Sequence, residues 1–229
     1  MNTNYKLKIC PNSDGKTASF IGVDDVTDEN TIFAALGKYE GFNNYETDEV
    51  LIIDEGEYDG KKYSITKITP CSVSHCRKVK EIFIGADVNE IDWNMYECVS
   101  LLNIRVDSKN KVFRDIDGVL FKDTELIAFP HGRKGKYTVP KGTKKLCNSS
   151  FKSCQIDKIV LPDSLEVIGI NVFYECRNLS EITLPAGIKK VAKNCDVGKV
   201  PIKQIFYLAE DTEHSNPLSI SEITKMFPA

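Results

Sequence analysis

Apolar residues recur along this chain with a period of 22 or 23 positions. Residues 158–168 (KIVLPDSLEVI) and 181–191 (EITLPAGIKKV) match at an offset of 23 in every apolar position and in the proline. Residues 81–91 and 136–146 fit the same template, with Gly85 in place of the proline in the first of them. The first apolar residues of the successive copies are Ile82, Ile104, Tyr137, Ile159, Ile182 and Ile205, at steps of 22, 33, 22, 23 and 23. A fixed period of this length indicates stacked structural repeats.

A second apolar motif follows these segments, with the pattern Ile/Leu-x4-Val/Phe-x2-Cys. Its copies are Ile68/Val73/Cys76, Leu146/Phe151/Cys154 and Ile168/Phe173/Cys176, with a copy one residue shorter at Ile91/Met95/Cys98. The first motif alternates and predicts a short strand, which the proline ends because it donates no ladder hydrogen bond. The second motif predicts a turn or a short helical segment, whose Phe and Cys fill the core from the opposite wall.

A unit of this size cannot bury its own apolar side chains, so successive units must stack in register. We therefore predict a solenoid with short parallel β-strands on one face and turns or short helical segments on the other. The step of 33 residues between Ile104 and Tyr137 is one period plus about ten extra residues, which we interpret as an insertion.

The combined motif resembles the BspA-like leucine-rich repeat family, the class with cysteine-bearing repeats of 22 or 23 residues. The stretches that carry the resemblance best are Leu179/Ile182/Leu184/Pro185/Ile188/Val191 and Leu165/Ile168/Phe173/Cys176. Residues 59–68 resemble the family's entry to its first full repeat, and residues 110–130 resemble its inserted hairpin. The last unit departs from the pattern, since Asp196 and Lys199 replace the Phe and Cys. The resemblance implies a non-enzymatic role in interaction or adhesion, often at bacterial or protist surfaces.

Three regions follow from these patterns. Residues 1–48 lack the period, and their alternation predicts a β-rich N-terminal cap with strands at 5–9 and 18–23. The leucine-rich repeat solenoid is expected at 49–208, with the inserted hairpin at about 107–135. Residues 209–229 are expected to form a C-terminal cap. Short helices are predicted at 31–36 and 219–227.

Composition limits the class of protein. Apolar residues make up 41% of the 229 positions and the net charge is −3, which argues against disorder and against a strongly basic nucleic-acid binder. No segment is long and apolar enough to span a membrane, and the first ten residues show no secretory signal. As written, the sequence predicts an intracellular adaptor or inhibitor of another macromolecule. A trimmed sequence would instead belong to a cell-surface or secreted adhesin that binds a host protein or glycan.

The near-neutral total hides two charged regions. Residues 21–59 carry a net charge of −11, whereas residues 131–158 carry +7. Two interpretations fit these regions: they are solvated edges of the repeat stack, or they steer a partner with the opposite charge pattern toward it. The sequence leaves both alternatives open.

Eight cysteines are the most unusual feature of the composition. Cys76, Cys98, Cys154 and Cys176 share one repeat position, where a buried thiol is favoured because Cys packs as a small hydrophobe. A disulfide ladder remains an alternative, since neighbouring strands lie about 4.8 Å apart, within the range for such bridges. No spacing typical of a metal site occurs, so neither a metal nor a cofactor is predicted.

Nothing in the sequence indicates catalysis. The three histidines, His75, His131 and His214, are expected at the surface, and no nucleophile elbow, phosphate-binding loop or zinc-protease motif occurs. A hydrolase would need two carboxylates that converge on one pocket, whereas stacked repeats place residues in rows. No catalytic residue is therefore assigned.

The period also predicts a binding surface. The residue between the two core positions of each strand points away from the core, which places one such residue per repeat in a row. The row is Phe83, Arg105, Thr138, Val160, Thr183 and Phe206, flanked by Glu81, Asn103, Lys136, Lys158, Glu181 and Gln204. We predict that a partner protein covers this row and the inserted hairpin, with caps or loops as the alternative cover of the row. A glycan is the second class of ligand considered, nucleic acid is disfavoured, and the chain is expected to be monomeric.

Overall fold

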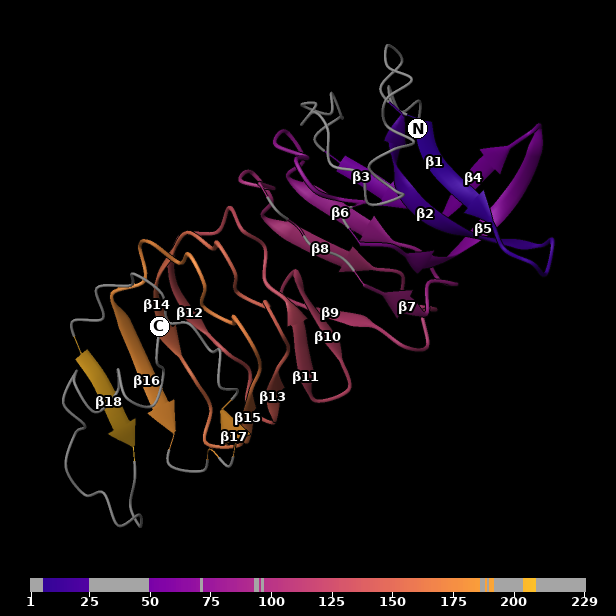
Figure 1. The fold of residues 1–229 in the computed structure, drawn as a ribbon. Coiled ribbons are helices and arrows are strands. Elements are labelled where there is room, and N and C mark those ends of the chain that lie inside the picture. Colours follow the sequence, from indigo (N-terminus) through magenta and orange to yellow (C-terminus); the bar gives the residue numbers. More distant parts are fainter. Residues whose placement is uncertain are drawn as a thin grey trace. The chain divides into compact units, whose positions relative to one another are not determined.

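The computed structural model describes residues 6–24, 50–70, 72–92, 95, 97–185, 188, 190–191 and 204–208. The chain divides into two compact units, Met1–Leu120 and Phe121–Ala229, and the division lies within strand β10 (Val119–Lys122). Every regular element in the described part is a β-strand, as Figure 1 shows. The helices expected at 31–36 and 219–227 lie outside the described residues, and the boundaries at 48/49 and 208/209 stay predictions.

The first unit begins with the hairpin that the alternation predicts. Strands β1 (Lys6–Pro11) and β2 (Thr17–Asp24) pair antiparallel. Asp14 holds the turn between them, because its carboxylate accepts hydrogen bonds from the backbone N–H groups of Lys16 and Thr17 at 2.8 and 2.9 Å. Strand β2 then pairs in parallel with β5 (Lys61–Ile68), so the hairpin extends the sheet that contains β4 (Glu55–Tyr58) and β7 (Glu90–Ile91).

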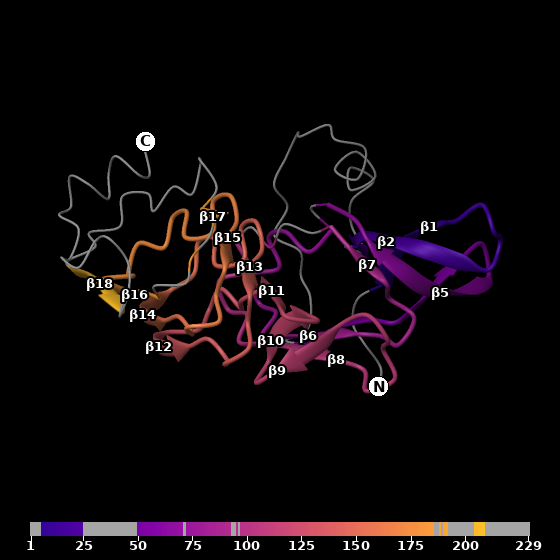
Figure 2. The same ribbon diagram turned by 90° about the horizontal axis from the view of Figure 1, so that it is seen from below.

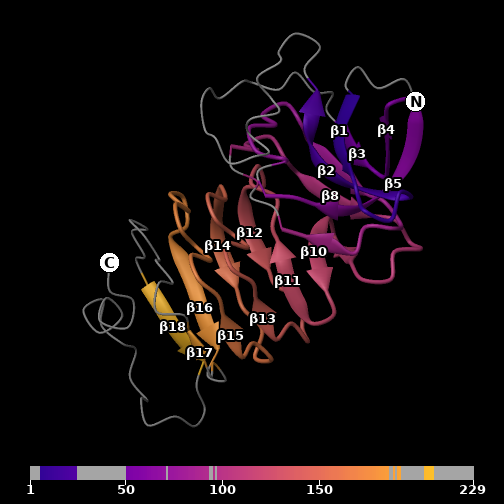
Figure 3. The same cartoon turned by 45° about the vertical axis from the view of Figure 1, so that its right-hand side comes forward.

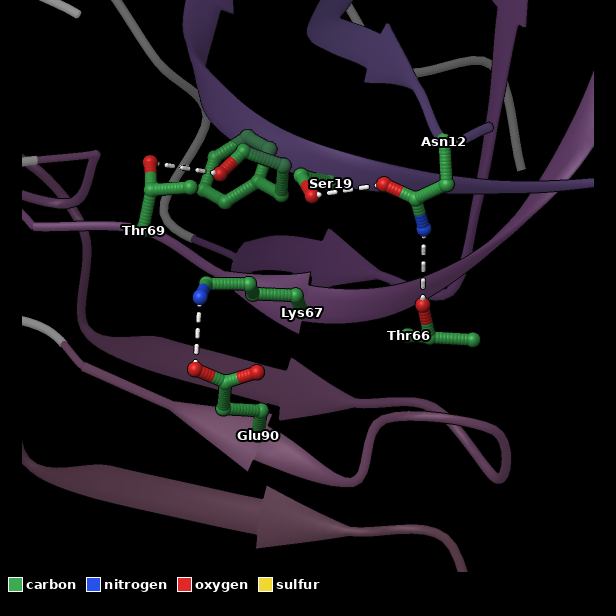
Figure 4. A network of polar contacts seen from close by, with 7 residues as sticks. Asn12, Ser19, Thr66, Lys67, Thr69 and Glu90 are labelled. Atoms are coloured by element: carbon green, nitrogen blue, oxygen red, sulfur yellow. Dashed lines mark hydrogen bonds and ion pairs between the residues drawn. The ribbon is translucent and has the colours of Figure 1, made fainter. Parts of the chain in front are cut away.

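Polar contacts fasten the hairpin to β5, as Figure 4 shows. Asn12 donates from Nδ2 to Thr66 Oγ1 at 3.2 Å and accepts at Oδ1 from Ser19 Oγ at 3.0 Å. Thr69 Oγ1 donates to the carbonyl of Phe20 at 2.9 Å, and the Phe20 ring itself is fully buried. The hairpin is therefore an integral part of the first unit rather than a loose extension.

The first unit also contains a parallel sheet with strand order β3-β6-β8. Its strands are β3 (Val50–Ile53), β6 (Glu81–Ile84) and β8 (Asn103–Val106), side by side in Figure 1. Leu51 is in register with Ile82, which is in register with Ile104, and all three side chains are fully buried. This burial is what the period predicts for the core positions.

Gly85 explains why one repeat lacks the proline. Its N–H donates to the carbonyl of Ile53 at 2.7 Å, a bond that proline is unable to make. A Cβ atom at this position would also lie 2.8 Å from the Cα atom of Asp54. Two neighbouring repeats therefore approach closely here, which only glycine allows without a shift.

The second unit has two parallel walls. One consists of β12 (Gly135–Thr138), β14 (Ile156–Val160), β16 (Glu181–Pro185) and β18 (Gln204–Leu208), shown in Figure 3. The other follows β11 (Glu125–Ala128) through β13 (Lys145–Leu146) and β15 (Val167–Ile168) to β17 (Lys190–Val191), and Figure 2 shows the two walls apart. The sequence left turns and short helical segments as alternatives for this second wall. In the described repeats it consists of turns and two-residue strands, and it contains no helical segment. 

A left-handed residue recurs in these turns. His75, Glu97, Ser153 and Glu175 have φ angles of 63°, 58°, 58° and 58°, and each stands directly before a repeat cysteine. A positive φ is unfavourable in a right-handed helix, so it interrupts any helical segment at this point. The cysteine that follows each of these residues is buried.

A ladder of aromatic rings fills the core of the second unit. Phe129, Phe151 and Phe173 are one period apart and at most 2% exposed. Ring centroids of Phe129 and Phe151 are 4.9 Å apart, and those of Phe151 and Phe173 are 5.7 Å apart. The ring of Tyr137, on β12, lies 4.6 Å from that of Phe129. Such pairs add to the burial of large apolar surfaces, so this ladder is a main source of stability.

The repeat cysteines are free, buried thiols. Cys76, Cys98, Cys154 and Cys176 are at most 1% exposed, as the packing interpretation expects, and none is in a disulfide. Three of them donate to the carbonyl of the residue 25 positions earlier: Cys98 Sγ to Val73 at 2.7 Å, Cys154 Sγ to Phe129 at 3.7 Å, and Cys176 Sγ to Phe151 at 2.8 Å. Each of these thiols thus also donates to a backbone carbonyl of the preceding repeat, and the carbonyl of Phe151 accepts from the N–H of Cys154 as well, at 3.1 Å.

These contacts predict the chemical behaviour of the thiols. Burial raises the pKa of Cys154 well above its ordinary value and that of Cys176 to about 12. Because only the thiolate is alkylated, we expect Cys154 and Cys176 to react with iodoacetamide at pH 8 about a thousand times more slowly than an exposed thiol. Mass spectrometry after timed labelling measures this, with exposed Cys10 as the internal reference. Labelling of Cys176 at the rate of Cys10 in the folded chain would contradict the burial.

Candidate partner-binding face

The outward side of the β3-β6-β8 sheet carries the first part of the predicted row. Phe83 is in register with Arg105 on the next strand and with Ile52 on the preceding one. Phe83 and Ile52 are half-buried, whereas Arg105 is exposed. This face therefore offers an apolar surface that ends at a cation.

Two carboxylates fix the position of Arg105. Its Nη1 lies 3.3 Å from Asp115 Oδ2, and its Nε lies 3.6 Å from Glu81 Oε2. Asp115 belongs to β9 (Arg114–Ile116) of the inserted segment, and its Oδ1 also accepts the N–H of Val106 at 2.9 Å. Since a guanidinium has five N–H donors, Arg105 is held in place and still has donors for a ligand.

The inserted segment also ends the β3-β6-β8 sheet at β8. The N–H groups of Ile104 and Val106 on β8 donate to the carbonyl of Gly118 and the carboxylate of Asp115, each at 2.9 Å. The next strand of the period, β12, belongs to a different sheet. The predicted single row is therefore divided between two sheets, because the insertion takes the hydrogen bonds that a further strand would need.

Sequence reasoning missed the first strand of this face. Val50 and Ile52 precede the predicted row, and the side chain of Val50 is 40% exposed. The alternating burial of β3 places both on the outward side. The available signal was the apolar run at 50–53, but Leu51 lies 31 residues before Ile82, so the period did not point to it.

The outward side of the second unit's main sheet carries the rest of the row. Thr138 is in register with Val160, Val160 with Thr183, and Thr183 with Phe206. Thr138 is exposed and Val160 half-buried. The side chains of Thr183 and Phe206 lie outside the described residues, so for these two only the register is established.

Most of the charged residues that flank the outward row form ion pairs. Lys158 forms an ion pair with Glu181 on the next strand, and Glu81 contacts Arg105. Equivalent pairs join neighbouring repeats elsewhere: Lys67–Glu90, Arg77–Glu97, Lys144–Glu166 and Lys145–Glu125. These flanks therefore help to set the register between repeats, whereas Lys136 is exposed at the start of β12.

Two histidines are buried, which corrects the expectation that they lie at the surface. His75 is 9% exposed and His131 is 5% exposed. The alternation of inward and outward side chains applies to strands. Both histidines lie in turns, where neighbouring side chains can point to the same side. Burial, with a smaller effect of Lys152, lowers the pKa of His131 to about 4, so its imidazole is neutral at pH 7. His214 lies outside the described residues.

The described residues offer no group of three or more side chains suited to hold a metal ion. Burial and then the neighbouring carboxylates of Glu55, Asp107 and Asp87 raise the pKa of Asp54. In the described part of the chain, nothing else around these four acidic residues points to a metal ion.

Among the residues that the structure describes, no helix is long and apolar enough to cross a membrane.

The two units carry opposite charge. Residues 1–120 contain 14 basic and 21 acidic residues, for a net charge of −7, and residues 121–229 contain 16 and 12, for a net charge of +4. The charge asymmetry seen in the sequence therefore coincides with the division into units.

Comparison with known proteins gives related structures. The pneumococcal vaccine antigen PcpA is 27% identical with a TM-score of 0.51, over 57% of this chain and 33% of PcpA. A leucine-rich repeat protein from Eubacterium ventriosum is 26% identical with a TM-score of 0.50, over 58% of this chain and 37% of that one. The chain thus matches only about a third of the length of these relatives. A search of curated proteins gives no match.

A family model settles the relationship. The BspA type leucine rich repeat region matches in six copies over residues 60–127 and 134–210, which is more than half of the chain. The gap between the two matched ranges falls where the inserted segment joins β12. Repeats of this kind are typical of non-enzymatic protein-interaction modules. The chain therefore belongs to the BspA-type leucine-rich repeat family.

Proposed function

We propose that this chain is a protein-binding module that captures its partner with the outward face of the β3-β6-β8 sheet. The face of the second unit that begins at Lys136 and Thr138 is proposed as a separate contact surface. The observation that carries the proposal is the juxtaposition of Phe83 with Arg105. A half-buried aromatic ring and a held guanidinium stand in register on adjacent strands. Aromatic and Arg side chains are the residue types most enriched in binding hot spots.

The rigidity of this face supports the same function. Arg105 is already oriented by Glu81 and Asp115, so a partner does not need to order it. Binding costs less when the contacting side chains are held in place beforehand. The inserted segment contributes Asp115, which gives it a role in shaping the face.

The test is a variant that removes both hot-spot side chains, Phe83→Ser with Arg105→Ala. The matched control in the same unit is Tyr58→Ser with Arg77→Ala, which removes an aromatic ring and an arginine away from this face. We expect the first variant to lose at least about tenfold in affinity for the captured partner, since hot-spot truncations cost 2 kcal/mol or more. The control should keep wild-type affinity.

The measurement is surface plasmon resonance with a partner captured from an extract of the native host. Circular dichroism melting checks that both variants are folded. Wild-type affinity in the folded Phe83/Arg105 variant would reject this face as the binding site.

The cellular role is either an intracellular adaptor or inhibitor, as the sequence predicts, or a cell-surface adhesin for a protein or glycan. One observation favours the second candidate, because the related pneumococcal protein is a vaccine antigen. The genomic sequence ahead of Met1 and antibody labelling of intact cells distinguish the two. Labelling of intact, unpermeabilised cells supports the adhesin, and labelling only after lysis supports the adaptor.

A further inference from the structure

Carboxylates lie where the outward face of the β3-β6-β8 sheet ends. Hydrogen bonds continue for one residue past the strands. The N–H of Gly85 donates to the carbonyl of Ile53 at 2.7 Å, and the N–H of Asp107 donates to the carbonyl of Ile84 at 2.9 Å. Asp54, Gly85 and Asp107 therefore follow the three strands side by side. Both aspartates are half-buried, so they form part of the surface rather than extend into solvent.

Gly85 leaves the space that the carboxylate of Asp54 occupies. A Cβ atom on Gly85 would overlap Oδ1 of Asp54, so any other residue here would push this carboxylate away. Burial raises the pKa of Asp54, and three nearby carboxylates raise it further, those of Glu55, Asp107 and Asp87. Within the described residues, none of these four carboxylates is in an ion pair. We call the four residues the acidic border.

An apolar surface lies beside the acidic border. Ile52 and Phe83 are in register on β3 and β6 and are half-buried, and Val50 at the start of β3 is 40% exposed. Ile52 lies two residues before Asp54, and Phe83 lies two residues before Gly85. The apolar surface and the acidic border are therefore adjacent parts of one sheet face.

This face carries an excess of negative charge. Arg105 is compensated, because Glu81 and Asp115 lie 3.6 and 3.3 Å from its guanidinium. The acidic border has no such counter-ion among the described residues, so a cation from a partner would be attracted and would also relieve the repulsion between the carboxylates. The complement of this face is thus an apolar side chain next to a positive one.

We infer that the partner segment held by this face is cationic and amphipathic, with an aliphatic side chain beside Phe83 and a Lys or Arg side chain at Asp54 and Asp107. The inference rests on the proposed function and adds the chemistry of the partner. Lys and Arg suit this place because their methylene stems can lie on an apolar surface while the charged end reaches the carboxylates. The donors that Arg105 retains can bind main-chain carbonyls of the segment.

Other occupants fit the face less well. A nucleic acid or an acidic glycan would be repelled, because its charges have the same sign as the acidic border. A second copy of this chain would bring a positively charged second unit to the face, so self-association is one outcome of the test.

The test uses three fluorescent nonapeptides in a Gly/Ser background, with Leu-Lys-Lys, Leu-Gln-Gln or Ser-Lys-Lys at the centre. Fluorescence anisotropy measures their affinity for the full chain at low and high salt. We expect the Leu-Lys-Lys peptide to bind about fivefold more tightly than the Leu-Gln-Gln peptide, because each surface ion pair contributes about two- to threefold. Replacing Leu with Ser should cost a similar factor, since part of an apolar side chain is then no longer buried. Added salt should weaken the binding of both lysine peptides.

The deciding variant is Asp54→Asn with Asp107→Asn, in which each amide keeps an oxygen that can accept a backbone N–H. It should lose the preference for lysine over glutamine and melt no lower than the wild type, because it removes repulsion. The matched control is Asp59→Asn with Asp92→Asn. It removes two exposed aspartates of the same unit, one in the turn between β4 and β5 and one directly after β7, and should keep the preference.

The inference is overturned by equal affinity for the lysine and glutamine peptides, by no binding of the Leu-Lys-Lys peptide, by equally tight binding of the Ser-Lys-Lys peptide, or by an equal loss in the control. A dimer in analytical ultracentrifugation that the Asp54/Asp107 variant dissociates would overturn it in favour of a second copy. Partner capture separates the two proposals. If the peptides fail but the Phe83→Ser, Arg105→Ala variant loses capture, only the cationic chemistry is rejected, whereas wild-type capture by that variant rejects the face itself.

Discussion

Replacing Phe151 with alanine is expected to lower the free energy of unfolding of the second unit by about 3–5 kcal/mol, the range for a buried Phe that leaves a cavity. Phe151 is fully buried and lies at the centre of the aromatic ladder. Its ring stacks on that of Phe129 at 4.9 Å, approaches that of Phe173 at 5.7 Å, and lies 6.1 Å from that of Tyr137. The substitution removes contacts with three repeats at once, so the loss is not confined to one of them.

Urea denaturation followed by circular dichroism measures this loss, and hydrogen exchange with mass spectrometry assigns it to residues 121–229. Two variants calibrate it. Phe151→Leu keeps most of the volume and should cost less than about 1.5 kcal/mol. Tyr174→Ala removes a half-buried ring outside the ladder and should cost still less. A loss under 1.5 kcal/mol for Phe151→Ala, as a rough threshold from the same range, would show that the ladder is not the main support of this unit.

Acidification is expected to destabilise the second unit through His131. The folded state holds the pKa of His131 at about 4, whereas an unfolded histidine titrates near 6.5. The unfolded chain therefore binds the proton first, and this contribution to stability is fully present above pH 6.5. It is lost as the pH falls from 6.5 toward 4. The pKa difference corresponds to about 3 kcal/mol in total, of which about 2 kcal/mol is lost between pH 7 and pH 5.

The matched variant for this prediction is His131→Gln, which removes the titrating group. Its stability is lower at pH 7 for reasons of packing, but it should fall less between pH 7 and pH 5 than the stability of the wild type. Restricting the comparison to this range keeps most carboxylates ionised. A histidine proton resonance for His131 that titrates near pH 6.5 in the folded chain would disprove the burial effect.

The repeat period predicted the strands because a core position every 22 or 23 residues leaves little choice of register. The pairs Ile82–Ile104 and Ile159–Ile182 are in register as the offsets require. The cysteine position was predictable for the same reason, as a recurrent small residue in the core. Its second role as a hydrogen-bond donor was not, because sequence alone does not show which carbonyl of the preceding repeat is buried.

Features that depend on single contacts could not be predicted. The division of the row into two sheets depends on Asp115 and Gly118, which occupy the hydrogen-bonding edge of β8. Burial of His75 depends on a turn with a φ of 63°, where strand alternation does not apply. The assignment of the binding face remains a prediction that rests on Phe83 and Arg105.

Contacts between neighbouring repeats determine where this chain can be shortened. The N–H of Phe151 donates to the carbonyl of Val172 in the following repeat, whereas its carbonyl accepts from the N–H of Cys154 in its own repeat as well as from the thiol of Cys176. A truncation before Val172 would leave the buried N–H of Phe151 without its partner, at about 1–3 kcal/mol, and would also remove the thiol contact. A cut placed after Cys176 keeps both contacts. The natural module boundary therefore follows the cysteine, and a designed fragment or a transplanted repeat should end there rather than at a strand.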